Sequence, residues 1–246
     1  MYLVLCSSMD IPAQWAHQGL LAHGLDARLL TAEMLESATQ WEHHLDSRTN
    51  SISFVLSDGQ AISGQEIDGV LNRLMAPSQN LARRAVPEDR DYALQETTAF
   101  YLSWLNSLSC PLLNQPTPQG LAGRWLHLSE LTLFAHQAGL TTLAYRQTGG
   151  DAPEAGYQPS PSPSLNKTQV ILLDGEVFGV AVPSAVSDGC RSLARLLQTR
   201  LLSVDFHSTP QDAWTFAFAN PVPDLQIGGP RLVECLARTL QNGGRQ

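Results

Sequence analysis

The sequence contains very little lysine: Lys167 is the only one, against fourteen arginines. A phosphate site that requires two lysines therefore cannot be built from these residues. Charged residues make up only 15% of the chain, and the formal net charge is −8. Since nucleic-acid binding is driven by clustered Lys and Arg side chains, this charge balance argues against nucleic acid as a partner.

Paired cysteines and long apolar runs are also absent from the sequence. No Cys-x-x-Cys pair occurs and no histidine stands at zinc-ligand spacing, so we predict buried free thiols. No apolar run reaches the roughly 18 residues that a membrane-spanning helix needs. The N-terminal segment lacks the basic leader of a signal peptide, and we expect a soluble, cytoplasmic protein without a membrane partner. The four cysteines are Cys6, Cys110, Cys190 and Cys235.

Short apolar runs alternate with helical segments in the first half of the chain. The runs at Tyr2–Leu5 and Ala27–Leu30 flank a predicted helix that Asp10 caps and that ends near His23. A second helix is predicted at Tyr92–Leu108, where apolar residues recur at spacings of three and four. This alternation predicts an α/β fold with an open sheet and flanking helices.

The composition changes at residues 147–165, which are rich in Pro, Ser and Gly and indicate a linker or exposed loop. A hairpin is predicted at 170–182, with Asp-Gly as its turn, and a helix at 186–198. Two further strands then carry Asp205 and Asn220, separated by a short turn. Oxygen ligands on neighbouring strands suit Mg²⁺, so this pair is a candidate metal site.

Several motifs follow one another in a recognisable order. A strand ending in Asn72-Arg73 precedes a helix and a strand ending in Asn-x-Pro, and the chain closes with a strand pair ending in Asn-Pro-x-Pro. In this order they resemble ATP-grasp ligases of the RimK and glutathione synthetase type, particularly a bacterial branch associated with peptide modification. The matching segments are Asp68–Leu74, Asp89–Glu96, Trp104-Leu105, Leu112–Pro118, Asp174–Gly179 and the strands of Asp205 and Asn220.

The resemblance implies a division of the chain. Residues 1–118 would form a pre-ATP-grasp α/β domain, 119–146 a connecting helix and strand, and 167–242 a reduced ATP-grasp C-terminal core. Active ligases of this type carry a small lid between these parts, with lysines and a Gly-rich loop over the nucleotide phosphates. Here the Pro/Ser-rich segment 147–166 takes that place and is too short for a four-stranded lid.

A second departure concerns the metal. The resemblance places a metal-bridging glutamate at the position of Phe218, which has no ligand atom, so this is a degenerate ligand position. Phosphoryl transfer depends almost entirely on positioning and charge neutralisation, so both departures imply a non-catalytic pseudoenzyme that acts as a scaffold or accessory subunit. A ligase with a rearranged or partner-completed nucleotide site is the first alternative, and a binder of anionic peptides or small molecules is the second.

The candidate site residues each have two interpretations. Asp205 and Asn220 either form a residual metal site or support turns. Arg73, Arg90 and Arg124 either form an anion pocket, since arginine binds carboxylates bidentately, or make surface ion pairs. No cofactor is expected, although residual Mg/ATP binding remains open, and the expected partner is another protein or a second copy of this chain.

Overall fold

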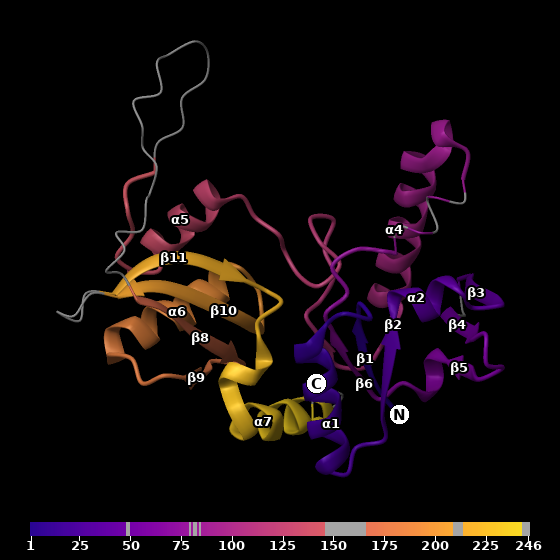
Figure 1. The fold of residues 1–246 in the computed structure, drawn as a ribbon, viewed down its shortest axis with the longest axis horizontal. Helices are drawn as coiled ribbons and strands as arrows, with labels where there is room; N and C mark the ends of the chain where they lie inside the picture. The colour runs from indigo at the N-terminus through magenta and orange to yellow at the C-terminus, as the bar shows by residue number, and fades with distance from the viewer. Residues whose placement is uncertain are drawn as a thin grey trace. The chain divides into compact units, whose positions relative to one another are not determined.

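The computed structural model describes residues 1–47, 50–78, 80, 83, 85–145, 166–208 and 214–242. It contains two compact units, which are described separately. Unit 1 comprises Met1–Trp125 and Asp224–Gln246, and unit 2 comprises Leu126–Pro223 (Figure 1). Both combine helices with sheets, so the predicted α/β fold class is confirmed. Almost all of the predicted linker lies outside the described residues.

A parallel sheet with the strand order β2-β1-β6-β7 forms the centre of unit 1. Helix α1 connects β1 to β2, and it begins as predicted: the Asp10 side chain accepts a hydrogen bond from the Ala13 amide at 3.0 Å. β1 is buried at four of its five residues, as expected for a central parallel strand. The elements are β1 (Tyr2–Cys6), α1 (Ile11–Ala22), β2 (Ala27–Thr31), α2 (Ala32–Glu36), β6 (Gly69–Asn72) and β7 (Leu112–Leu113).

A three-stranded antiparallel sheet and one long helix complete the aromatic core of unit 1. Trp41, Phe54, Phe100, Tyr101 and Trp104 pack edge-on or tilted, with neighbouring ring centroids 4.7–6.2 Å apart. Such pairs contribute beyond the area they bury. The elements are β3 (Gln40–Leu45), β4 (Asn50–Val55), β5 (Ala61–Ser63), η1 (Gly64–Glu66), η2 (Pro87–Asp89) and α4 (Arg90–Ser107).

The C-terminal helix α7 (Gly229–Asn242) belongs to unit 1, after the short helix η3 (Leu225–Gly228). It packs on α1, where a methyl group at Gly19 would lie 2.5 Å from Val233 Cγ1. The absence of a side chain at Gly19 therefore permits this close approach. The sequence-based division assigned residues 224–242 to a C-terminal core, because periodicity shows that a helix has an apolar face but not which element covers it.

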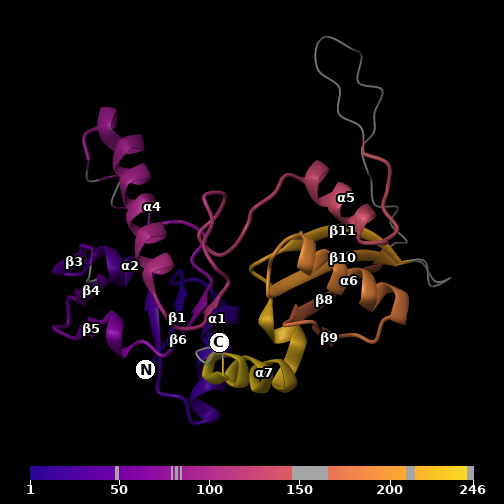
Figure 2. The ribbon, with the colours of Figure 1, turned by 180° about the vertical axis from the view of Figure 1, so that it is seen from behind.

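Unit 2 consists of an antiparallel sheet with the order β11-β10-β8-β9, and helices α5 and α6 pack against it (Figure 2). Its core includes Val170, Leu172, Val204, Phe206 and residues of both helices. The hairpin predicted around Asp-Gly is present, with both turn residues at positive φ. The elements are α5 (Leu128–Gln137), β8 (Asn166–Leu173), β9 (Glu176–Gly179), α6 (Ser184–Leu196), β10 (Leu201–Ser208) and β11 (Trp214–Asn220).

Helix α5 begins at Leu128, within the segment 119–146 for which a connecting helix and strand were expected. A capping box fixes this start: Glu130 accepts a hydrogen bond from the His127 backbone, and the His127 ring accepts one from Ser129. Sequence periodicity did not reveal the histidine as a cap, because the usual caps are Ser, Thr, Asp and Asn. Within the described residues, no helix combines the length and apolar character needed to cross a bilayer.

Candidate functional site

The pairing of β10 with β11 sets the geometry of the candidate metal site. Asp205 lies opposite Phe218, and Ser203 lies opposite Asn220. Residues directly opposite in an antiparallel pair share one face of the sheet, and positions i and i+2 share it as well. Asp205 and Asn220 are therefore diagonal neighbours on one face, with Phe218 beside the carboxylate.

Both carboxylate oxygens of Asp205 have partners on a neighbouring strand. Gln169 Nε2 donates to Asp205 Oδ1 at 2.5 Å, and Lys167 Nζ lies 3.1 Å from Asp205 Oδ2. Both partners come from β8, where Gln169 is opposite Asp205 and Lys167 is two residues earlier. The Asp205 side chain is only 10% exposed, whereas that of Lys167 is 69% exposed. Each carboxylate oxygen thus has a protein donor, and the only lysine of the chain supplies the neutralising charge.

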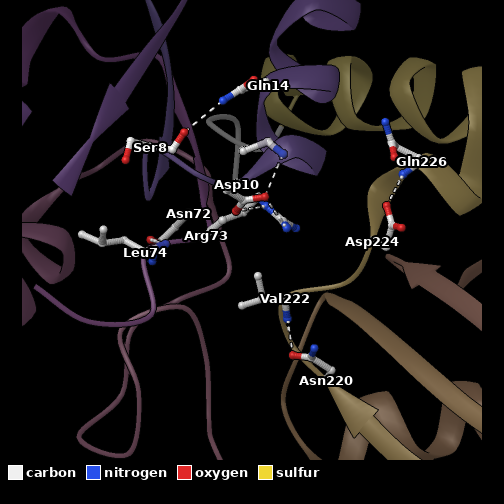
Figure 3. Close-up of polar contacts among 11 residues, drawn as sticks. Ser8, Asp10, Gln14, Asn72, Arg73, Leu74, Asn220, Val222, Asp224 and Gln226 are labelled. Atoms are coloured by element: carbon white, nitrogen blue, oxygen red, sulfur yellow. Dashed lines mark hydrogen bonds and ion pairs between the residues drawn. The ribbon is translucent and has the colours of Figure 1, made fainter. Parts of the chain in front are cut away.

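The Asn220 side chain makes a hydrogen bond to the backbone two residues further along the chain. Its Oδ1 accepts a hydrogen bond from the Val222 backbone amide at 2.9 Å (Figure 3). This Asx-type turn shapes the bend into Pro221-Val222-Pro223. The oxygen expected to contribute to a metal site therefore accepts a backbone donor, which agrees with the turn interpretation of Asn220.

The residues on this sheet face do not fit Mg²⁺. The ion prefers octahedral oxygen coordination, but Phe218 supplies no oxygen, and Asp205 holds an ammonium group at one of its two oxygens. Phe218 instead packs, half-buried, against the apolar core of unit 2. Among the described residues, no group of three or more His, Cys, Asp or Glu side chains gathers as a metal site.

His207 follows Asp205 on β10 and is opposite Lys167 on β8. Its side chain lines a cavity of about 120 Å³ with Thr132 of α5 and Tyr145. Its Nδ1 atom is buried and has no hydrogen-bond partner among the described residues. A β-bulge between Asp205 and Phe206 shifts the pairing with β11 at this point.

In unit 1, the carboxyl ends of the parallel strands bring Asp10 and Arg73 together. Asp10 follows β1 and Arg73 follows β6, so both lie at the same edge of the sheet. Arg73 Nε donates to Asp10 Oδ2 at 2.9 Å, and Arg73 Nη2 donates to Asp10 Oδ1 at 3.0 Å (Figure 3). The side chains are 4% and 12% exposed for Arg73 and Asp10, respectively. This is a bidentate, largely buried ion pair.

The three predicted anion-binding arginines have different surroundings. Asp10 neutralises Arg73, the most buried of them. Arg90 is exposed at the first residue of α4, and Arg124 is half-buried in the loop before α5. A shared pocket of Arg73, Arg90 and Arg124 stays a prediction, and sequence reasoning missed Asp10 as the partner because it identified that residue only as a helix cap.

Asn72, next to Arg73, holds the chain near the end of β7. Its Nδ2 donates to the backbone oxygens of Asn114 at 3.1 Å and Leu121 at 2.6 Å, and its Oδ1 accepts from the Leu74 amide at 3.2 Å. Asn72 is 1% exposed. The Asn-Arg motif of this strand therefore stabilises unit 1 through buried polar contacts, which are costly to leave unpaired.

No family model matches the chain, and no curated protein matches its sequence. Solved structures do match its fold. The macrocyclase MdnC of Microcystis aeruginosa MRC, bound with its precursor peptide MdnA, aligns with a TM-score of 0.74 at 14% identity, over 98% of this chain and 100% of MdnC. A RiPP-associated ATP-grasp ligase of Chryseobacterium gregarium, in complex with ADP and a leader and core peptide, gives 0.73 at 10% identity, over 98% of this chain and 96% of the ligase.

A third similar structure is the ATP-grasp ligase PsnB with minimal precursor, Mg and ADP. It aligns with a TM-score of 0.64 at 15% identity, over 97% of this chain and 98% of PsnB. At sequence identities this low, structural similarity establishes the fold alone. The chain has the fold of ATP-grasp ligases.

Proposed function

We propose that this chain is a non-catalytic protein with an ATP-grasp fold that acts as an accessory or scaffold subunit in peptide or amino-acid modification. The observation that carries the proposal is that the Asp205 carboxylate is already engaged, in an ion pair with Lys167 and a hydrogen bond from Gln169. Its expected partner is a protein or peptide, or a second copy of the chain, and its expected location is the cytoplasm.

The physical reason concerns charge. Metal-assisted phosphoryl transfer needs cations that bridge the phosphate oxygens and neutralise the charge that develops on them. The ion pair with Lys167 cancels the formal charge of Asp205, and Phe218 offers no second carboxylate. The face therefore lacks the negative, oxygen-rich surroundings that attract Mg²⁺.

The peptide part of the proposal is supported by the comparisons. MdnC and the Chryseobacterium gregarium ligase were both solved with peptides, and both share the fold of this chain. A reduced chain of the RimK type, with the segment 147–166 in place of a lid, is part of the same proposal. Loss of the lid would leave a peptide-binding scaffold without the phosphate clamp.

A second candidate is an ATP-dependent carboxylate–amine ligase whose nucleotide site is rearranged or completed by a partner. The observation that favours it is the exposure of Lys167, whose side chain is 69% accessible. Because the lysine side chain extends into solvent, a bound nucleotide could displace its ammonium group from Asp205. The C. gregarium ligase and PsnB, which share this fold, were solved with ADP.

Titration calorimetry of the full chain with ATP, with and without Mg²⁺, tests the proposal. We expect no Mg²⁺-dependent binding at millimolar ATP, for either the wild-type chain or Asp205→Asn. Glu234→Gln, which removes an exposed carboxylate on α7, is the matched control. Micromolar, Mg²⁺-dependent binding that Asp205→Asn abolishes and Glu234→Gln retains would overturn the proposal and establish the second candidate.

A further inference from the structure

A cavity of about 540 Å³ lies in unit 2, away from Asp205, at the C-terminal end of α6. Its walls come from α6, the turn between β8 and β9, and the segment before β10. Cavities of roughly 300–1,000 Å³ are typical of small-molecule sites. The lining residues are Asp174, Gly175, Arg191, Ala194, Arg195, Gln198, Thr199 and Arg200.

Two of the three arginines in this cavity are held in place by the protein. Arg200 makes a bidentate pair with Asp174, with Nε–Oδ1 at 2.7 Å and Nη2–Oδ2 at 2.9 Å. Arg191 Nε donates to the Gly175 backbone oxygen at 2.9 Å, and its Nη1 donates to Asp188 at 2.8 Å. These contacts orient both guanidinium groups, although the Arg191 and Arg200 side chains are 43% and 42% exposed, respectively.

The third arginine, Arg195, has no carboxylate partner among the described residues. Its Nε donates to the Arg191 backbone oxygen at a long 3.4 Å, a hydrogen bond in which neither Nη atom takes part. Arg195 lies four residues after Arg191, so both point from one side of α6. Asp174 and Asp188 offset two of the three positive charges, which leaves a net formal charge of +1 in a chain whose total is −8.

A stabilising effect on the helix end does not explain this arrangement. A cation in the last turn of α6 favours the helix dipole, and Arg195 alone would supply it. Arg200 lies outside the helix and, paired with Asp174, lines the same cavity. The cavity is therefore lined by three arginines, and guanidinium groups are donors suited to carboxylate and phosphate oxygens.

We infer that this cavity binds a small organic anion through Arg195, by a carboxylate or a phosphate group. The cavity is much larger than one oxyanion, so the rest of the ligand packs on Ala194 and the arginine methylenes. The site depends on neither Asp205 nor nucleotide chemistry, and it goes beyond the proposed function. An acidic peptide side chain and a free metabolite present the same chemistry, and the test separates these sources.

The experiment is calorimetric titration of the full chain at low ionic strength with three probes: inorganic phosphate, citrate and an N-acetylated tri-glutamate peptide. We expect saturable binding of at least one probe. Arg195→Gln should weaken it about 10-fold or more, the loss of one charged hydrogen-bonding group, and Arg195→Glu should abolish it. Arg231→Gln, an exposed arginine on α7, is the matched control and should retain wild-type affinity.

Equal thermal midpoints of the Arg195 and Arg231 variants would show that folding is unaffected. Binding of the peptide but not of phosphate or citrate identifies a peptide carboxylate as the source, and the reverse identifies a free anion. No saturable binding of any probe, or equal losses in Arg195→Gln and Arg231→Gln, overturns the inference. ATP bound through this cavity would be independent of Mg²⁺ and insensitive to Asp205→Asn, which separates this outcome from the test of the proposed function.

Discussion

Replacement of Asp10 by alanine should strongly destabilise unit 1, because this carboxylate both caps α1 and neutralises Arg73. Breaking a buried ion pair by removing one partner costs about 3–5 kcal/mol, since the other charge stays buried. Loss of a helix N-cap costs about 1 kcal/mol. Because the Arg73 side chain is only 4% exposed, the cost for a buried pair applies. We therefore expect the free energy of unfolding to fall by about 4 kcal/mol or more.

Urea unfolding measures this loss, followed by circular dichroism and tryptophan fluorescence. The chain has two compact units, so each transition is fitted separately. Asp10→Asn keeps a capping side chain and should be about 1 kcal/mol less damaging than Asp10→Ala. Asp188→Asn, whose carboxylate is 73% exposed in its pair with Arg191, should change stability by less than about 1 kcal/mol. A loss for Asp10→Ala no larger than that of Asp188→Asn would refute the reasoning.

Three further changes test other parts of the fold. Gly19→Ala should lower the free energy of unfolding by about 1–2 kcal/mol, because overpacking against the stiff Val233 side chain outweighs the gain in helix propensity. Trp104→Ala should cost about 3–5 kcal/mol, because it removes a buried ring. Trp104→Phe keeps a ring and removes a buried indole N–H that has no partner among the described residues, so it should cost less than about 1 kcal/mol. Burial raises the pKa of the Cys6 and Cys190 thiols from 9.0 to about 12. Unfolded thiols therefore lose protons at lower pH than folded ones, and stability should fall as pH rises from about 9 toward 12.

Each of these expectations has a clear contrary result. A Gly19→Ala variant as stable as wild type would show that α7 moves away from α1 at no cost. Equal losses for the two Trp104 variants would contradict this reasoning, because Phe keeps much of the ring packing that Ala removes. For the thiols, urea curves at pH 8.5 and 10.5 are compared in wild type and Cys190→Ala, and an unchanged pH slope in the variant would contradict the assigned cause.

Local chemistry was sufficient to predict much of the chain. The cap at Asp10, the Asp-Gly hairpin and the strands of Asp205 and Asn220 all follow from patterns within a few residues, and the structure contains each of them. β3 was not predicted, because Gln40–Leu45 carries few apolar residues and becomes a strand through its pairing with β4.

The identity of each side chain's partner was decided by the tertiary structure. Asp10 meets Arg73 because two parallel strands end at one edge of a sheet, and Asp205 meets Lys167 because the register of β8 against β10 brings them together. Register and topology depend on contacts between segments far apart in the chain, which no local pattern encodes. The sequence by itself therefore determined the elements and the absence of a carboxylate at Phe218, and only the folded chain decided that its single lysine neutralises Asp205.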